Sequence, residues 1–155
     1  MKMSENMKEE VQALMEDILA GKISVADARG ITDEELESAY ALGYSFYGVG
    51  DWEKAETVFR FLTMMSHLDV KYWMALGAAR QAKKDWQGAL KVYAHVCVNL
   101  DSRNVKASLR AAECYLRLGD RKNAASALQH VRRFADPATD EGMEALKAAA
   151  ALIEE

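Results

Sequence analysis

The sequence repeats itself at an interval of 34 residues, and this period restricts the fold more than any other feature. Six pairs of positions match between the first and second copies: Leu42 with Leu76, Gly43 with Gly77, Asp51 with Asp85, Trp52 with Trp86, Ala55 with Ala89, and Phe59 with Tyr93. A third copy follows at a shift of 35 residues with Asp120, Ala124 and Leu128, so one residue is inserted near "NLDSRN". Units of this length bury their apolar faces by stacking on their neighbours.

Composition favours helices over strands along the whole chain. The 155 residues include one proline and nine glycines, and Ala, Leu, Met, Glu and Lys are abundant. We therefore predict a single all-α domain. Apolar periodicity and capping signals place its helices at about 5–20, 33–48, 52–66, 70–83, 86–99, 104–118, 121–134 and 139–154.

The spacing of small and large residues in the first copy resembles the tetratricopeptide repeat, a 34-residue helix-turn-helix unit. The matching positions are Leu42, Gly43, Phe46, Gly50, Ala55 and Phe59. The resemblance implies three repeats (about 36–69, 70–103 and 105–137) that form a short right-handed superhelix over residues 33–136. Residues 1–32 would form an N-terminal helical segment, and residues 138–155 a C-terminal capping helix.

Recurring acidic residues predict where helices begin. Asp51, Asp85 and Asp120 each precede the second helix of a repeat, where a carboxylate can accept a hydrogen bond from the free backbone N–H groups. The stretch Thr32-Asp-Glu-Glu35 predicts a capping box for helix 33–48.

Small residues predict where paired helices touch. Gly43 and Gly77 would allow close approach of the second helix, which presents Ala55, Ala89 and Ala124 in successive copies. A larger side chain at these positions is expected to overpack the contact by about 1–3 kcal/mol.

The two flanking helices carry apolar stripes that need cover. The stripe of the last helix, Met143, Leu146, Ala150 and Ile153, is predicted to pack on the third repeat. The stripe of the first helix has two interpretations that the sequence leaves open, packing on its own repeat or self-association in a homodimer. Its members are Val11, Leu14, Met15, Ile18 and Leu19.

Helix 33–48 has more apolar surface than one packing face requires. Leu42, Gly43 and Phe46 are predicted to face the helix partner, which leaves Tyr40, Tyr44 and Tyr47 within about 60 degrees of one another on the adjoining side. The alternative is that these tyrosines cover the N-terminal segment. Otherwise they begin a peptide-binding groove with a predicted lining of Tyr40, Tyr44, Tyr47, Lys71, Met74, Ala78, Gln81, Leu109, Glu113 and Leu116. Such a lining suits an extended peptide with alternate apolar anchors.

Several classes of function are excluded by what the sequence lacks. Twenty basic and 24 acidic residues give a net charge of -4 without a long basic cluster, which argues against nucleic acid. No window of about 18 apolar residues suggests a membrane span, so a cytoplasmic protein is expected. Cys97 and Cys114 have no metal-binding or redox spacing and are expected to be reduced thiols. No catalytic motif occurs; we expect no enzyme activity, no cofactor and no metal.

A narrower resemblance extends over about residues 23–134. The "YALG" at 40–43, the tyrosine row, the glycine-Trp turn and the His67-x-Asp69-x-Lys71-Tyr72 junction together resemble the class II chaperones of bacterial type III secretion, of the LcrH/SycD type. "LGAARQ" (76–81) and "AAECYLRLGD" (111–120) are similar to their counterparts there.

The resemblance implies a chaperone of the bacterial cytoplasm without ATPase activity. It would hold hydrophobic translocator proteins by a segment near their N-terminus, bound in the concave groove, and keep them soluble for export. Homodimers occur in this family, and some members act on transcription through a partner regulator, which the sequence here does not decide. The alternatives are a generic tetratricopeptide adaptor and a structural subunit of the secretion apparatus. Adaptors of charged peptide termini need several basic groove residues, and Lys71 is the only one predicted here.

Overall fold

The computed structural model describes residues 4–154, and each predicted helix is present within them. The helices are α1 (Glu5–Leu19), α2 (Val25–Ala28), α3 (Asp33–Gly48), α4 (Trp52–Met65), α5 (Val70–Ala82), α6 (Trp86–His95), the π-helix η1 (Val96–Leu100), α7 (Val105–Arg117), α8 (Arg121–Phe134) and α9 (Asp140–Ala151). The sequence does not predict the single turn α2. Residues 1–3 and 155, the outermost parts of the two predicted terminal segments, lie outside the described residues.

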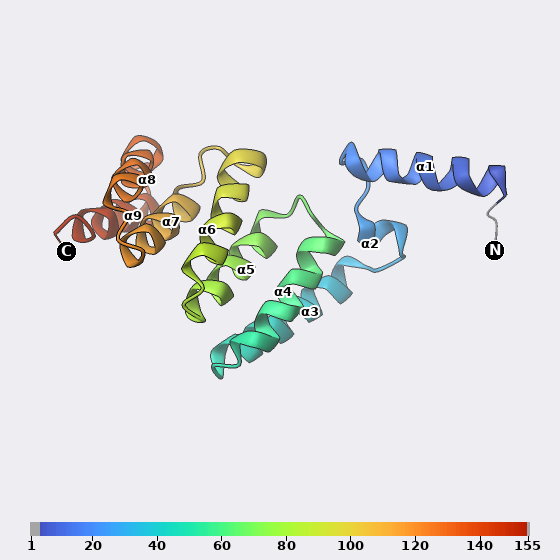
Figure 1. Cartoon of the computed structure of the whole chain (residues 1–155), viewed down its shortest axis with the longest axis horizontal. Helices are drawn as coiled ribbons and strands as arrows, with labels where there is room; N and C mark the ends of the chain where they lie inside the picture. Colours follow the sequence, from blue (N-terminus) through green and yellow to red (C-terminus); the bar gives the residue numbers. More distant parts are fainter. Residues whose placement is uncertain (1–3, 155) are drawn as a thin grey trace.

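The helices stack in chain order from one end of the molecule to the other (Figure 1). Each helix from α3 to α8 packs on the next, and the buried side chains form three neighbouring clusters along the stack. The all-α prediction is confirmed. In this arrangement α3, α5 and α7 are the first helices of successive pairs, and they follow one another along the stack.

Capping side chains start the helices where the sequence predicts. Asp51, Asp85 and Asp120 accept hydrogen bonds from backbone N–H groups three residues on, at N···O distances of 3.3, 2.9 and 3.1 Å. Thr32 and Glu35 form the predicted capping box. The turn before each second helix is therefore fixed locally.

In each of the first two helix pairs, an aromatic ring of the second helix packs against a glycine of the first helix. A Cβ atom on Gly77 would lie only 2.5 Å from Cε1 of Tyr93, and one on Gly43 would overlap the ring of Phe59. Phe59 and Tyr93 are fully buried, as are Ala55 and Ala89 beside them. The 34-residue period is thus the spacing of a repeated glycine–aromatic contact.

Leu42 does not pack in the core, although the sequence predicts that it does. Its side chain is 50% exposed, whereas the matching Leu76 is 2% exposed. The difference arises because Leu76 lies between two helix pairs, while no preceding pair covers α3. Gly43 is buried as predicted, and Phe46 is half-buried.

The inserted residue that lengthens the second repeat is absorbed by a change in helix type. The predicted helix 86–99 is α-helical only to His95 and continues as the π-helix Val96–Leu100. A π-helix bonds each N–H to a carbonyl five residues back, so it accommodates one more residue per turn than an α-helix. Val96 remains fully buried in the core, and the third pair keeps its packing despite the insertion.

The last helix covers the third pair, as predicted, but through a different stripe. α9 packs on both α7 and α8. Its buried residues are Gly142, Ala145 and Ala149, while the predicted Met143, Ala150 and Ile153 are exposed and Leu146 is half-buried. The small residues allow α9 to lie close to the backbone of Asp136, since a Cβ on Gly142 would overlap the carbonyl of that residue.

The first helix does not pack on its own repeat. None of its residues is buried, and α1 projects from the remainder of the molecule (Figure 1). Of the two interpretations of its apolar stripe, packing within one chain is therefore wrong. The short α2, with the buried Ala26, joins the core of the first repeat instead.

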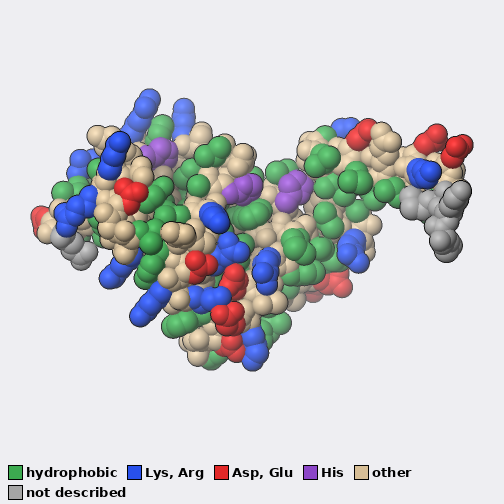
Figure 2. Space-filling view, in the orientation of Figure 1, with side chains coloured by type: hydrophobic (Ala, Val, Ile, Leu, Met, Phe, Trp, Pro, Cys, Tyr) green, Lys and Arg blue, Asp and Glu red, His purple; other side chains and the backbone are tan. Residues whose placement is uncertain are grey.

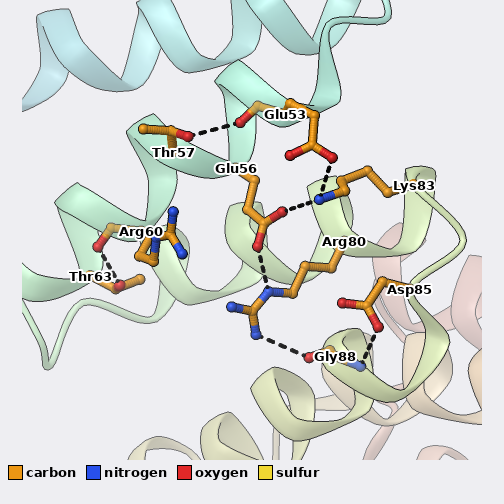
Figure 3. A network of polar contacts seen from close by, with 9 residues as sticks. All are labelled: Glu53, Glu56, Thr57, Arg60, Thr63, Arg80, Lys83, Asp85 and Gly88. Carbon is orange, nitrogen blue, oxygen red and sulfur yellow. Dashed lines mark hydrogen bonds and ion pairs between the residues drawn. The ribbon is translucent and has the colours of Figure 1, made fainter.

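An ion network joins the first two repeats (Figure 3). The carboxylate of Glu56 accepts hydrogen bonds from Arg80 Nε at 3.0 Å and Lys83 Nζ at 2.6 Å, and Arg80 also donates to the carbonyl of Gly88. Burial raises the pKa of the Glu56 carboxyl, but the bonds from Lys83 and Arg80 outweigh burial and hold that pKa below its ordinary value. Lys83 pairs in addition with the exposed Glu53.

Replacing Gly77 with alanine should destabilise the protein by about 1–3 kcal/mol, because the added methyl group meets the buried ring of Tyr93. Gly48→Ala is the matched control, since this helical glycine has open space where its Cβ would be, and alanine favours helices by about 1 kcal/mol. Urea denaturation measures both changes. Equal stability of the two variants would contradict the proposed packing contact.

Glu56→Gln should lower the free energy of unfolding by about 1–3 kcal/mol at neutral pH, because the two cations lose a charged acceptor. The folded pKa is below the unfolded value, so the wild type should lose this contribution as the pH falls through the folded pKa. The difference between the two proteins should therefore shrink below the ordinary carboxyl pKa of 4.5.

Glu53→Gln is the control, since its carboxylate is 79% exposed and an exposed pair contributes about 0–1 kcal/mol. Urea titrations across the acid range compare the three proteins. A Glu56→Gln variant as stable as Glu53→Gln, or a difference that persists in acid, would contradict the role assigned to the network.

Candidate peptide-binding groove

Three tyrosines line one side of α3, as helical spacing predicts. The ring centroids of Tyr40 and Tyr44 are 4.9 Å apart, and those of Tyr44 and Tyr47 are 6.0 Å apart. Tyr44 is 43% exposed, whereas Tyr40 and Tyr47 are half-buried. The row is therefore a continuous aromatic surface that is most open at Tyr44.

Tyr40 also packs against the core of the first repeat. Its ring lies 6.0 Å from Phe59 and 5.5 Å from Tyr72. Burial, with a smaller contribution from Tyr44, raises the pKa of the Tyr40 hydroxyl. The N-terminal residues Val25 and Ile31 join the same apolar cluster, yet Tyr44 remains exposed.

Lys71, a predicted groove residue, has its charge engaged within the protein. Its ammonium group pairs with Glu37 and lies 5.2 and 5.1 Å from the ring centroids of Tyr40 and Tyr72. The hydroxyl of Tyr72 donates to the same carboxylate at 3.2 Å. Burial, with the neighbouring Glu37, raises the pKa of Tyr72 to about 12. Lys71 thus links α3 to α5.

A hollow of about 640 Å³ opens where α3, α5 and α7 face one another. Five of the ten predicted groove residues line it and come from all three repeats: Tyr47, Ala78, Gln81, Glu113 and Leu116. The structure therefore brings together side chains that are far apart in the sequence.

A chain of hydrogen bonds holds the floor of this hollow. The buried hydroxyl of Tyr93 donates to Gln81 Oε1 at 2.9 Å, and Gln81 Nε2 donates to Glu113 Oε2 at 2.7 Å. Arg110 Nη1 donates to the same carboxylate at 3.1 Å. Because Gln81 is bonded on both sides, its position is set before anything binds.

Other predicted groove residues lie elsewhere. Met74 packs on the cluster around Tyr93, and Leu109 packs on the cluster formed with α8 and α9. Leu109 does not line the hollow as predicted, because its half-buried side chain packs toward α8 and α9. Arg110 next to it lines the hollow instead.

The sequence interpretation missed the basic side of the groove. Arg110, Arg117 and Arg121 line the hollow together with Ala82, Trp86 and Leu152. The sequence interpretation names Lys71 as the only basic groove residue, but Lys71 does not line the hollow and these three arginines do. Arg110, Glu113 and Arg117 share the spacing i, i+3, i+7, which signals a common helix face. Arg121 and Leu152 belong to other helices and carry no such signal.

The predicted self-association stripe lies open on α1. Val11, Leu14, Met15 and Leu19 are 42, 40, 56 and 81% exposed, and Ile18 is half-buried. Hydrophobic surface is visible on α1 and on the nearby part of α4 (Figure 2). Contiguous exposed apolar surface of this kind is typical of sites that contact another protein.

The two cysteines are free thiols, as predicted. Burial raises the pKa of Cys114 to about 11, and burial also raises that of Cys97. Both thiols therefore stay protonated and weakly reactive at neutral pH. Among residues 4–154, no helix is long and apolar enough to span a membrane.

Comparison with known proteins identifies the repeats and their relatives. Residues 36–69, 70–104 and 106–135 match tetratricopeptide-repeat families. The chain is 32% identical to low calcium response locus protein H of Yersinia pestis over 120 residues, which are 77% of this chain and 71% of that protein. It is 30% identical to the chaperone protein SicA of Salmonella typhimurium over 138 residues, 89% of this chain and 81% of SicA.

Solved structures share both the fold and a clear sequence likeness. PcrH of Pseudomonas aeruginosa, solved with the chaperone-binding region of PopD, superposes with a TM-score of 0.74 at 34% identity over 81% of this chain and 92% of that one. SycD of Yersinia enterocolitica, solved with a peptide of the translocator YopD, gives 0.74 at 29% identity over 80% and 93%. An alternative dimer of the same SycD gives 0.74 at 29% identity over 80% and 92%.

The repeat signatures, the relatives and the superpositions agree with the resemblance found in the sequence. The chain belongs to the class II chaperones of bacterial type III secretion, the tetratricopeptide-repeat family of low calcium response locus protein H and SicA.

Proposed function

We propose that this protein is a cytoplasmic chaperone that holds hydrophobic translocator proteins in a type III secretion system before export. The main support for the proposal is the hollow between α3, α5 and α7, in which one extended segment of the client would bind. The residues proposed to bind are Tyr47, Ala78, Gln81 and Leu116, which line the hollow, together with the exposed Tyr44 beside Tyr47 on α3.

Two relatives that have been solved in complex with a client segment support this proposal. PcrH was solved with the chaperone-binding region of PopD, and SycD with a peptide of the translocator YopD. Both structures superpose on this chain over about four fifths of its length. The groove in this chain is therefore proposed to take the corresponding segment of its own translocators.

The physical basis of capture is burial of apolar side chains in a preformed groove. Each well-buried aliphatic anchor contributes roughly 1.5–3 kcal/mol, and the loss of peptide freedom opposes it. Fixed side chains such as Gln81, bonded to Tyr93 and Glu113, reduce the ordering that the groove itself requires. Binding and release need no chemical step, so the mechanism is passive.

A second proposal concerns α1. Because none of its residues is buried within one chain, we infer that Val11, Leu14, Met15, Ile18 and Leu19 cover one another, or a neighbouring surface, in a homodimer. The related SycD has been solved as a dimer. An amphipathic helix that projects from the fold is suited to an isologous contact.

Removing Tyr44 and Tyr47 should impair client capture more than stability. We expect Tyr44→Ala/Tyr47→Ala to bind translocator at least about tenfold more weakly, because aromatic contact area is lost from the groove. The assay is co-expression with the translocators PopB, PopD and YopD, scored by their soluble fraction and by co-purification in equal amounts. A structural subunit of the apparatus would rescue none of them.

Phe61→Ala is the matched control, because this aromatic residue has a similar exposure of 40% and lies on α4, outside the hollow. It should leave capture unchanged. Full capture by a correctly folded double tyrosine variant would overturn the groove assignment.

Placing a charge in the α1 stripe should dissociate the dimer. Leu14→Glu is expected to shift the protein from dimer to monomer in sedimentation velocity, because a buried unpaired carboxylate is strongly disfavoured. Deletion of residues 1–20 should have the same effect, because it removes the stripe itself. Ala13→Glu adds the same charge on the opposite side of α1, where this residue is exposed, and should leave the dimer intact. A monomeric wild type at the working concentration would rule out this proposal.

A further inference from the structure

The charges around the hollow are not balanced. Its lining includes Arg110, Glu113, Arg117 and Arg121. The carboxylate of Glu113 is already bound by Arg110 and Gln81. Within residues 4–154, the side chains of Arg117 and Arg121 form no ion pair and no hydrogen bond. The hollow therefore presents two positive charges in a protein of net charge -4.

The start of α8 adds to this local positive potential. Arg121 is the first residue of α8, and no acidic residue lies in its first turn. The capping Asp120 is bound by Asn123, whose backbone and side-chain nitrogens donate at 3.1 and 2.6 Å. A helix N-terminus normally favours negative charge, so Arg121 is unfavourable there unless an anion binds. Arg117, in the last turn of α7, adds a second positive charge to the same hollow.

The surroundings of the two arginines are partly apolar. The guanidinium carbon of Arg117 lies 5.9 Å from the ring centroid of Trp86, and Ala82, Leu116 and Leu152 also line this end of the hollow. The aromatic face restricts Arg117 and leaves its hydrogen-bonding edge available. An anion here would be flanked by carbon, as an acidic side chain within an apolar peptide is.

We propose that Arg117 and Arg121, beside Trp86, bind an acidic side chain that flanks the apolar anchors of the translocator segment. This inference rests on the proposed function and adds a chemical requirement to the partner. The segment places apolar side chains toward Tyr44 and Tyr47 and an aspartate or glutamate at the opposite end. The guanidinium groups donate charge-assisted hydrogen bonds to that carboxylate, and salt weakens the contact.

Four synthetic peptides test this requirement. Each contains the chaperone-binding region of PopD, with Asp-Asp or the neutral Asn-Asn joined to its N-terminal or C-terminal end, so that both directions in the groove are covered. Fluorescence anisotropy at low salt should show that one Asp-Asp peptide binds about tenfold more tightly than its Asn-Asn counterpart. Arg117→Gln/Arg121→Gln should abolish this gain, so that the variant binds the Asp-Asp and Asn-Asn peptides with equal affinity.

Arg132→Gln/Arg133→Gln is the matched control, because it removes the same charge from the other end of α8 and should preserve the gain. Circular dichroism verifies that both double variants fold. Equal binding of the Asp-Asp and Asn-Asn peptides by the wild type would overturn the arginine site alone. Failure of all four peptides to bind would overturn the groove proposal as well.

The C-terminal residues of the protein are the competing occupant. Glu154 lies two residues beyond Leu152, which lines the hollow. A gain that appears only in Glu154→Gln would assign the arginines to this segment and would overturn the proposal for the translocator. A gain of the same size in Glu154→Gln and in the wild type would support it.

Discussion

The contact between a helical glycine and a buried aromatic ring governs this structure. Gly43 faces Phe59 and Gly77 faces Tyr93, and in both places a single methyl group would collide with the ring. The contact sets the distance between the two helices of a pair. Because it recurs after 34 residues, the pairs α3–α4 and α5–α6 are closed by the same kind of contact.

Tyr93 links this packing to the candidate site. Its ring closes the second helix pair against Gly77, while its hydroxyl holds Gln81 at the floor of the hollow. Burial raises the pKa of this hydroxyl, so it remains a hydrogen-bond donor at neutral pH. The same side chain thus stabilises the repeat and positions the groove residue Gln81.

The ends of the stack behave differently from its middle because they lack a neighbouring repeat. Leu42 is exposed where Leu76 is buried. At the other end, α9 covers the third pair with Gly142, Ala145 and Ala149, whose small size permits close approach. At the N-terminal end, none of the residues of α1 is buried. We attribute its open stripe to a contact between chains, in line with the proposed dimer.

The sequence alone determined the repeat, the helices of the three pairs, the caps of their second helices and the family, because these depend on local periodicity and on residue types at fixed spacing. It also predicted the tyrosine row, since that row lies on one helix. It did not predict α2 or the π-helix η1. Tertiary structure decided which side chains meet from different helices. Sequence periodicity could not show that Arg121 and Leu152 join Arg117 around one hollow, or that Leu109 turns into the core. Such contacts depend on the angle at which helices cross, and a small change in that angle moves neighbouring residues between core and groove.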